Sequence, residues 1–159
     1  MTIMTSRQEP ISLADMGKRD LRTQFAALCY RMVKGKPEIL LITSRRSGRW
    51  IVPKGWPADG KTPSESALTE AWEEAGVIGK AHNVGLGLFS YHKQVDDQTD
   101  LPCVAMVYPV KVKSVANKFP EAGMRKRKWL SPKKAAERVN EPELADIIRR
   151  FDPGMFTRL

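Results

Sequence analysis

Cysteine and histidine are scarce in this chain of 159 residues, which has two of each. Cys29 and Cys103 lie in apolar runs, AALCYRMV and LPCVAMVYPV, and neither has a metal-type partner nearby. We therefore expect both to be buried thiols in strands. Zinc-finger spacing, an RNP-like aromatic motif and a heptad-linked basic region are all missing, so specific nucleic-acid recognition has little support. The pattern around His92, LGLFSYHKQ, leaves open whether this side chain points toward a site.

Long apolar runs are also missing, and no stretch is long enough to cross a bilayer. The N-terminal residues do not have the pattern of a signal peptide. We therefore expect no membrane partner. A reducing cytoplasm is the simplest compartment for a chain with two unpaired thiols.

Acidic residues are outnumbered, since 27 Lys and Arg face 18 Asp and Glu and the formal net charge is +9. The basic residues form short clusters, at 45–49 and at 125–128. Such a surface favours anionic partners, although a solvated face without a specific role is the alternative for each cluster. The first cluster is the more informative, because its turn leads directly into the strand and loop that precede a group of acids.

That group consists of Glu70, Glu73 and Glu74 in TEAWEEAG, whose i, i+3, i+4 spacing places three carboxylates on one helical face. No Lys or Arg lies between Lys61 and Lys80, so the acids have no local counterion. The helix is expected to end at Gly76, where the macrodipole disfavours acids. A solvated face is the ordinary explanation. A hard divalent cation such as Mg²⁺, which binds oxygen ligands and substrate phosphates, would relieve both conflicts.

The start of this helix is specified locally. Thr62 is a suitable cap, Pro63 suits the first helical position, and Glu65 completes a capping box. The helix is predicted at 63–75, with an apolar stripe of Ala67, Leu68, Ala71, Trp72 and Ala75.

The rest of the chain alternates between strands and helices. Ser131 with Pro132 predicts a short helix, and Asn140 with Glu143 predicts the cap of another that runs toward Phe151. An α/β fold with a mixed sheet between helices follows. Strands are predicted at 23–33, 37–44, 50–53, 84–94, 102–113 and 126–130.

The segment GWPADGKTPSESALTEAWEEAGV resembles the Nudix box, the loop-helix-loop signature of Nudix hydrolases. Lys61 stands where the family has a Glu, and Thr69 where it has an Arg. The loss of an acid together with a base avoids a single unpaired charge. The box residues that fit the family pattern are Gly55, Glu70, Ala71, Glu73, Glu74, Gly76 and Val77.

The resemblance covers residues 21–151 and is greatest to diphosphoinositol polyphosphate phosphohydrolases and diadenosine polyphosphate hydrolases. The segments RTQFAALCYR, ILLITSRRSGRWIVP and RKRKWLSPKKAAERV carry it outside the box. It implies an α/β/α sandwich in 21–151, with a tail or edge segment at 1–20 and a C-terminal tail at 152–159.

The resemblance also implies a Mg²⁺-dependent hydrolase, with Mn²⁺ as an alternative ion, that cleaves a phosphoanhydride bond in a polyphosphorylated small molecule. Glu70, Glu73 and Glu74 would bind the cation and act in catalysis, and the Gly55 carbonyl would be a further metal ligand. The substrate-binding residues that it implies are Arg22, Ser44, Arg46 and Arg49. Lys61 is added as a further substrate-binding candidate, because its ammonium could contact phosphate as a point charge.

The proton acceptor is not decided by the sequence. In some branches a box glutamate serves, here Glu70 or Glu74, and in others an acid on a later loop does. The later candidates are Asp96, Asp97, Asp100 and Glu121.

Two other functions stay open. Lys61 and Thr69 motivate a Nudix-fold module that binds a polyphosphorylated ligand without cleaving it, because Lys61 either repels metal or contacts phosphate as a point charge. The 5′-triphosphate end of RNA is a second possible substrate within the family, although basic charge alone predicts only salt-sensitive, nonspecific binding.

Overall fold

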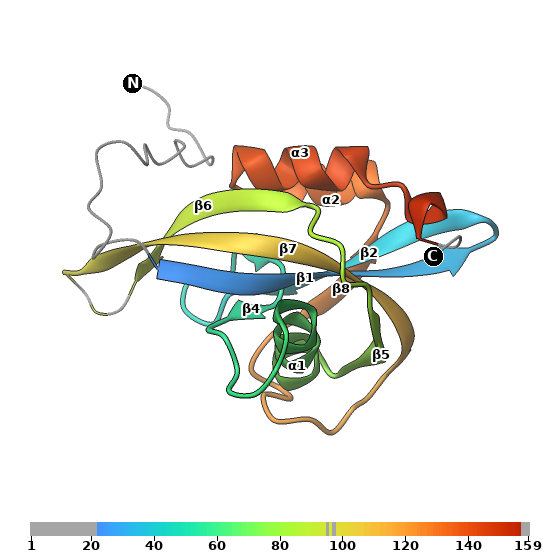
Figure 1. Cartoon of the computed structure of the whole chain (residues 1–159). Helices are drawn as coiled ribbons and strands as arrows, with labels where there is room; N and C mark the ends of the chain where they lie inside the picture. The colour runs from blue at the N-terminus through green and yellow to red at the C-terminus, as the bar shows by residue number, and fades with distance from the viewer. Residues whose placement is uncertain (1–21, 95, 97, 157–159) are drawn as a thin grey trace.

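A computed structural model describes residues 22–156 except 95 and 97, and these residues form a mixed sheet between helices (Figure 1). The strand order is β3-β2-β1-β7-β5, while β4 pairs with β1, β6 with β7 and β8 with β2. The strands are β1 (Arg22–Val33), β2 (Lys36–Thr43), β3 (Trp50–Ile51), β4 (Lys54–Gly55), β5 (Val77–Ala81), β6 (Gly87–Gln94), β7 (Asp100–Val115) and β8 (Arg127–Leu130). The helices are α1 (Pro63–Ala75), α2 (Pro132–Arg138), α3 (Pro142–Arg150) and the short 3₁₀ helix η2 (Pro153–Met155).

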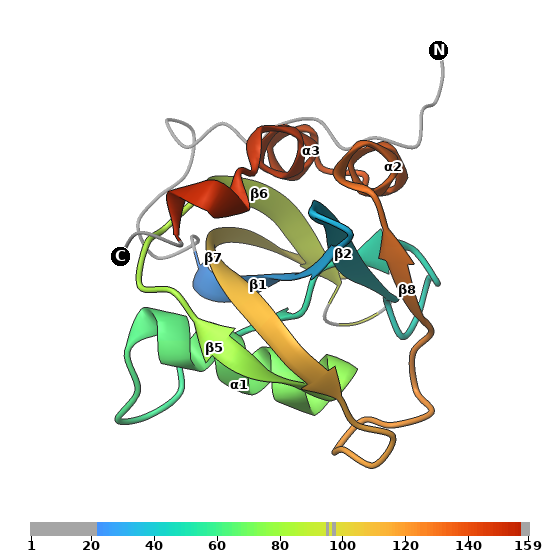
Figure 2. The same cartoon turned by 90° about the vertical axis from the view of Figure 1, so that its right-hand side faces the viewer.

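The centre of the sheet is the parallel pair of β1 and β7, in register from Arg22 opposite Cys103 to Tyr30 opposite Lys111. The other pairings are antiparallel. α1 covers one face of the sheet, and α2 and α3 cover the other (Figure 2). The predicted α/β/α sandwich with a mixed sheet is confirmed.

Each face of the sheet has its own hydrophobic core, as the period of two along a strand requires. In β1, Ala26, Leu28 and Tyr30 face α2 and α3, whereas Ala27 and Cys29 face α1. Cys103 is buried as well. Both cysteines are thus buried thiols in strands, as expected, and burial raises the pKa of Cys29 to about 12.

The local signals at the start and end of α1 act as predicted. The Thr62 side chain accepts a hydrogen bond from the Glu65 backbone N–H, and the Glu65 carboxylate accepts one from the Thr62 N–H. Gly76 closes the helix with a left-handed φ of 70°. Ala67, Ala71 and Ala75 are fully buried. Leu68 and Trp72 are half-buried, and the Trp72 ring packs against Phe119, 6.4 Å between centroids.

Two short strands were not predicted. β5 follows the Gly76 cap without intervening turn residues, and its pairing with β7 is irregular between Ile78 and Gly79. A side chain at Gly79 would overlap the Lys111 carbonyl oxygen, so only glycine allows this close approach. β4, only two residues long, places Gly55 opposite Phe25 of β1.

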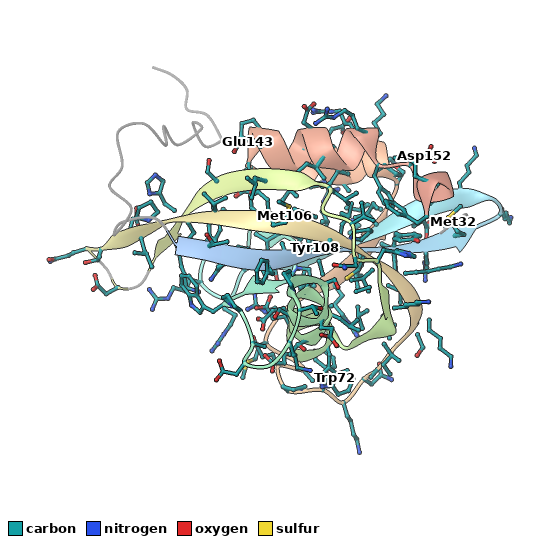
Figure 3. All side chains as sticks on the ribbon, viewed as in Figure 1. Met32, Trp72, Met106, Tyr108, Glu143 and Asp152 are labelled. Carbon is teal, nitrogen blue, oxygen red and sulfur yellow. The ribbon has the colours of Figure 1, made fainter. Side chains whose placement is uncertain are left out.

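The predicted cap of α3 is wrong. The cap residue is Glu141 rather than Asn140, and its side chain makes no capping hydrogen bond. Glu143 lies at the start of α3 above β6 (Figure 3). Its Oε1 accepts hydrogen bonds from the backbone N–H of Ser90 at 2.9 Å and from the Ser90 hydroxyl at 3.0 Å. The acid therefore ties the helix to the sheet.

The segment after residue 151, expected to be a tail, packs against the domain as far as Phe156. This side chain is 5% exposed and stacks on His82, 5.1 Å between centroids. The predicted tail or edge segment at 1–20 lies outside the described residues.

Candidate active site

Glu70 and Glu74 lie against the backbone of β4. A side chain at Gly55 would overlap the Glu70 carboxylate, so the two residues are in close contact. The Lys54 backbone N–H donates to Glu74 Oε1 at 3.4 Å. Two of the three predicted acids therefore flank the short strand that carries the predicted carbonyl ligand, Gly55.

Glu70 carries an electrostatic conflict. Burial raises its pKa to about 7, and the nearby carboxylates of Glu74, Glu73 and Glu121 add to the increase. Burial also raises the pKa of Glu74, but Arg125 and Lys54 act against that rise. Glu74 thus has cationic neighbours that lower its pKa, whereas Glu70 is surrounded by acids.

The counterion missing from the local sequence comes from the segment before β8. Arg125 Nη2 lies 3.7 Å from Glu74 Oε2 and 3.2 Å from Glu121 Oε1. Arg125 Nη1 donates to the Thr43 carbonyl oxygen at 3.1 Å. The acids lack a counterion in their own segment, as the sequence indicated, but a sequence-distant guanidinium pairs with Glu74.

The C-terminal end of α1, which carries the negative charge of the macrodipole, is also contacted by an arginine of this segment. Arg127 Nη1 donates to the Ala75 carbonyl oxygen at 2.9 Å and to the Ala116 carbonyl oxygen at 2.8 Å. A guanidinium therefore sits at the helix C-terminus, where positive charge is favourable. Along this extended segment Arg125 and Arg127 are half-buried, whereas Lys126 and Lys128 are exposed.

The donor set at the helix suits a hard divalent cation. Glu70, Glu74 and the Gly55 carbonyl offer oxygen atoms, the ligand type that Mg²⁺ prefers, and a cation bound there would relieve the repulsion that raises the pKa of Glu70. In the part of the chain that the structure describes, no three His, Cys, Asp or Glu side chains are already gathered around one point. Carboxylates and a carbonyl with water as the remaining ligands fit the way in which Mg²⁺ is usually bound.

The basic loop, residues 44–49, is organised by Ser44. The Ser44 hydroxyl accepts from the Arg49 backbone N–H at 3.1 Å, and the Ser44 N–H donates to the Arg49 carbonyl oxygen at 2.7 Å. Arg49 Nε donates to Ser47 Oγ at 3.1 Å. These contacts fix the path of the loop between β2 and β3.

The basic loop and Glu74 face one cavity of about 520 Å³. It brings together four predicted site residues: Ser44, Arg46, Arg49 and Glu74. The residues that line it are Gln24, Ser44, Arg45, Arg46, Ser47, Arg49, Ile51, Lys54, Glu74, Tyr91, His92, Lys93, Arg125 and Glu141.

The other predicted site residues are not among those that line this cavity. Glu70 and Glu73 do not line the cavity, and Lys61 is exposed in the loop before α1. Arg22 begins β1, and its side chain is outside the description. Asp96 is exposed, and its Oδ1 accepts from the backbone N–H groups of Gln98 and Thr99. Asp97 lies outside the described residues, and Asp100 is exposed at the start of β7.

Several cavity residues were not predicted. Lys54 could have been suspected, because it precedes the box glycine. Its ammonium lies 4.7 Å from the centroid of the Tyr91 ring. Burial lowers the pKa of Lys54, while Glu74 and Glu141 act against that fall. No local signal marks Gln24, Tyr91 or Glu141, because β1, β6 and the residue before α3 come together only in the fold. His92, whose direction the sequence left open, lines the cavity.

Gln24 is a buried member of the same wall. Its Oε1 accepts a hydrogen bond from the Tyr91 hydroxyl, while its Nε2 has no hydrogen-bond partner among the described residues. This amide adds a neutral donor to a cavity that is otherwise rich in cations.

The sequence model of the NUDIX domain family matches residues 22–151. The chain belongs to the Nudix hydrolase family. The predicted resemblance is therefore confirmed, and the helix with its three glutamates is a Nudix box in which Lys61 and Thr69 replace two family residues.

Curated relatives of this Nudix protein include Nudix hydrolase 12, mitochondrial, from Arabidopsis thaliana, which is 33% identical over 105 residues. That match covers 64% of this chain and 52% of the relative, so the chain spans about half of its length. Human diphosphoinositol polyphosphate phosphohydrolase 3-alpha is 29% identical over 133 residues, 81% of this chain and 77% of that protein.

Solved structures share the fold. A Caenorhabditis elegans Ap4A hydrolase binary complex superimposes with a TM-score of 0.61 at 18% identity, covering 87% of this chain and 99% of that one. The NUDIX domain of Shewanella oneidensis NrtR, complexed with ADP ribose, gives a TM-score of 0.59 at 15% identity, covering 86% of this chain and 94% of that one. At these identities the likeness concerns the fold alone.

Proposed function

We propose that this Nudix protein is a Mg²⁺-dependent hydrolase that cleaves a phosphoanhydride bond in a polyphosphorylated small molecule. The proposed substrates are of the diphosphoinositol polyphosphate or dinucleoside polyphosphate type. The observation that carries this proposal is the shared cavity, where Glu74 of the box helix and the arginines of the basic loop face one space of about 520 Å³. The names of the relatives support the same substrate classes.

The chain provides two kinds of groups for this reaction. Arg46 and Arg49 would bind the phosphates of the substrate, since guanidinium groups match phosphate geometry. Ser44 would keep the loop in position through its contacts with Arg49. Arg22 and Lys61 stay predictions as further phosphate contacts.

Glu70, Glu73, Glu74 and the Gly55 carbonyl form the proposed metal-binding set. A divalent cation held there would lower the pKa of a bound water and offset charge that develops on the phosphates. Mn²⁺ has the same preference for carboxylate, carbonyl and water ligands, and it is the proposed alternative ion.

Glu70 is the favoured proton acceptor. Burial and the neighbouring carboxylates raise its pKa, so it takes up a proton more readily than an exposed carboxylate does. The contacts of two later candidates favour other roles, because Asp96 holds its own turn and Glu121 pairs with Arg125. Glu74 is less suited, since Arg125 and Lys54 stabilise its charged form.

A binding or regulatory module that does not cleave its ligand is the competing function. The observation that favours it is the position of Lys61, an exposed cation in the loop before α1, where the family pattern has an acid. Hydrolysis of an RNA 5′-triphosphate end is a second alternative. No described helix is both long enough and apolar enough to traverse a bilayer, and the cytoplasmic compartment stays a prediction.

Phosphate release decides between these functions. Purified protein with Mg²⁺ is incubated with diphosphoinositol, dinucleoside polyphosphate, nucleoside diphosphate-linked and 5′-triphosphorylated RNA substrates. We expect cleavage of at least one small molecule, and a loss of cleavage in Glu73→Gln and Glu74→Gln but not in Glu137→Gln, an exposed residue of α2. If ligands bind without turnover and Glu73→Gln changes nothing, the protein is a binding module. Preferential cleavage of the RNA would favour that alternative.

A further inference from the structure

The box of this protein lacks the arginine of the family pattern. Thr69 occupies that position, and its hydroxyl donates to the Glu65 carbonyl oxygen at 3.0 Å, one turn back in the same helix. This hydrogen bond holds the Thr69 side chain against the backbone of α1. The residue therefore contributes no charge to the acids that follow it.

Arg125 supplies a guanidinium from another part of the chain. Its side chain is only 10% exposed, as is that of Glu74. Besides the ion pair with Glu74, Arg125 Nε and Nη2 donate to Glu121 Oε1 at 3.3 and 3.2 Å. A single planar group thus contacts two carboxylates and, through Nη1, the carbonyl oxygen of Thr43.

The contact with Thr43 connects this guanidinium to the basic loop. Thr43 ends β2 and directly precedes the loop. The Lys126 backbone N–H donates to Thr43 Oγ1 at 2.9 Å, and the Thr43 N–H donates to the Lys126 carbonyl oxygen at 3.1 Å. Three hydrogen bonds therefore fix the segment of Arg125 against the start of the loop.

We propose that Arg125 is a positioning residue that replaces the missing box arginine, holding the Glu74 carboxylate in its metal-binding orientation and fixing it relative to the basic loop. This inference rests on the proposed metal-dependent function. It also explains how Thr69 is tolerated, because the positive charge that α1 lacks is supplied by the Arg125 guanidinium, from the segment before β8.

The geometry requires an arginine. Its fork directs Nε and Nη2 at Glu121 and Nη1 at Thr43, while Nη2 also lies 3.7 Å from Glu74. A lysine ammonium is a point charge that cannot reproduce this fork. Removal of the guanidinium leaves the half-buried Glu121 and the buried Glu74 without a guanidinium partner. Among the contacts of Glu74 in the described residues, the hydrogen bond from the Lys54 backbone N–H at 3.4 Å would then remain, which is too weak to fix the carboxylate by itself.

Substitutions at two positions, alone and combined, test the proposal. Arg125→Ala, Arg125→Lys and Thr69→Arg are made singly, and Thr69→Arg is added to each Arg125 variant. Mg²⁺ affinity is measured by calorimetry without substrate, and kcat and KM are measured on a substrate that the wild type cleaves. Arg150→Ala serves as the control, because that arginine is exposed and pairs only with Asp146 in the described residues.

We expect Arg125→Ala to weaken Mg²⁺ binding and lower kcat by roughly 10–100-fold, the usual cost of losing a residue that orients a metal ligand. Arg125→Lys should retain only part of the affinity. In the Arg125→Ala background, Thr69→Arg should raise Mg²⁺ affinity and kcat again by roughly tenfold or more. In the wild type, the same substitution should change both quantities by less than about twofold. Thermal unfolding and near-ultraviolet circular dichroism establish that each variant is folded. If Arg125→Ala does not fold, the Arg125→Lys pair provides the same comparison.

Two results would overturn the proposal. If Arg125→Ala raises KM but leaves kcat and Mg²⁺ affinity unchanged, Arg125 contacts substrate and does not position Glu74. If Thr69→Arg restores nothing, Arg125 does not replace the box arginine. A wild-type protein that binds Mg²⁺ but cleaves no substrate would reject the hydrolase function alone, because the calorimetric comparison still decides the role of Arg125.

Discussion

The Glu70 carboxylate occupies the space beside the Cα of Gly55, so that a methyl group at Gly55 would overlap it. Gly55→Ala should therefore push Glu70 away from β4. We expect Mg²⁺ affinity to fall roughly tenfold or more, measured by calorimetry. In a Glu70→Ala background, the same glycine substitution should lower Mg²⁺ affinity by less than about twofold. Equal costs in both backgrounds would show that Gly55 acts independently of Glu70.

The raised pKa of Glu70 predicts a pH-dependent stability of the metal-free protein. The folded pKa of about 7 lies above the unfolded value of 4.5, so the folded state binds the proton more tightly. The resulting stabilisation is fully present below pH 4.5 and is lost as pH rises through about 7. The thermal midpoint in EDTA, measured relative to Glu70→Gln, should fall across this window and then level off.

The same shift predicts the pH dependence of metal binding. Mg²⁺ must displace the proton from Glu70, so its affinity should rise as pH increases through about 7 and then become constant. Calorimetric titrations at several pH values measure this dependence. Glu70→Gln should remove it, whereas a pH dependence unchanged in that variant would assign the proton to another group.

The basic loop should control KM and its salt dependence. Loss of one phosphate contact costs about 1.5 kcal/mol, or roughly tenfold, so we expect Arg46→Ala and Arg49→Ala to raise KM by about this factor with little change in kcat. The effect should shrink at high salt. Because Lys61 is exposed and does not line the cavity, Lys61→Ala should raise KM less. An equal increase would place Lys61 at the substrate.

The packed C-terminal segment should contribute to stability. Phe156 is buried against His82 and Phe151, and a Phe→Ala change in a core costs about 3 kcal/mol. For a domain of this size we expect Phe156→Ala to lower the thermal midpoint by about 6–12 °C. Met155→Ala, at a position that is 65% exposed, should leave it nearly unchanged. Equal midpoints for both variants would mean that Phe156 adds nothing to the core.

The features that the sequence could predict are those with local causes. The cap at Thr62 and the glycine at 76 define α1 through contacts within a few residues. The acids on this helix could be recognised from their spacing. Their partner Arg125 could not, because only the pairing of β8 with β2 brings that segment near α1. The cap of α3 was missed for a similar reason, since Glu143 binds Ser90 of a distant strand.

The alternation of Arg125, Lys126, Arg127 and Lys128 means that the length of this segment is constrained. Trp129 and Leu130 pair with β2, and Leu130 is buried in the core, so the frame of β8 is anchored downstream. Deletion of Lys128 would exchange the two sides on which Arg125, Lys126 and Arg127 lie. Lys126 would then face α1, and both arginines would face solvent.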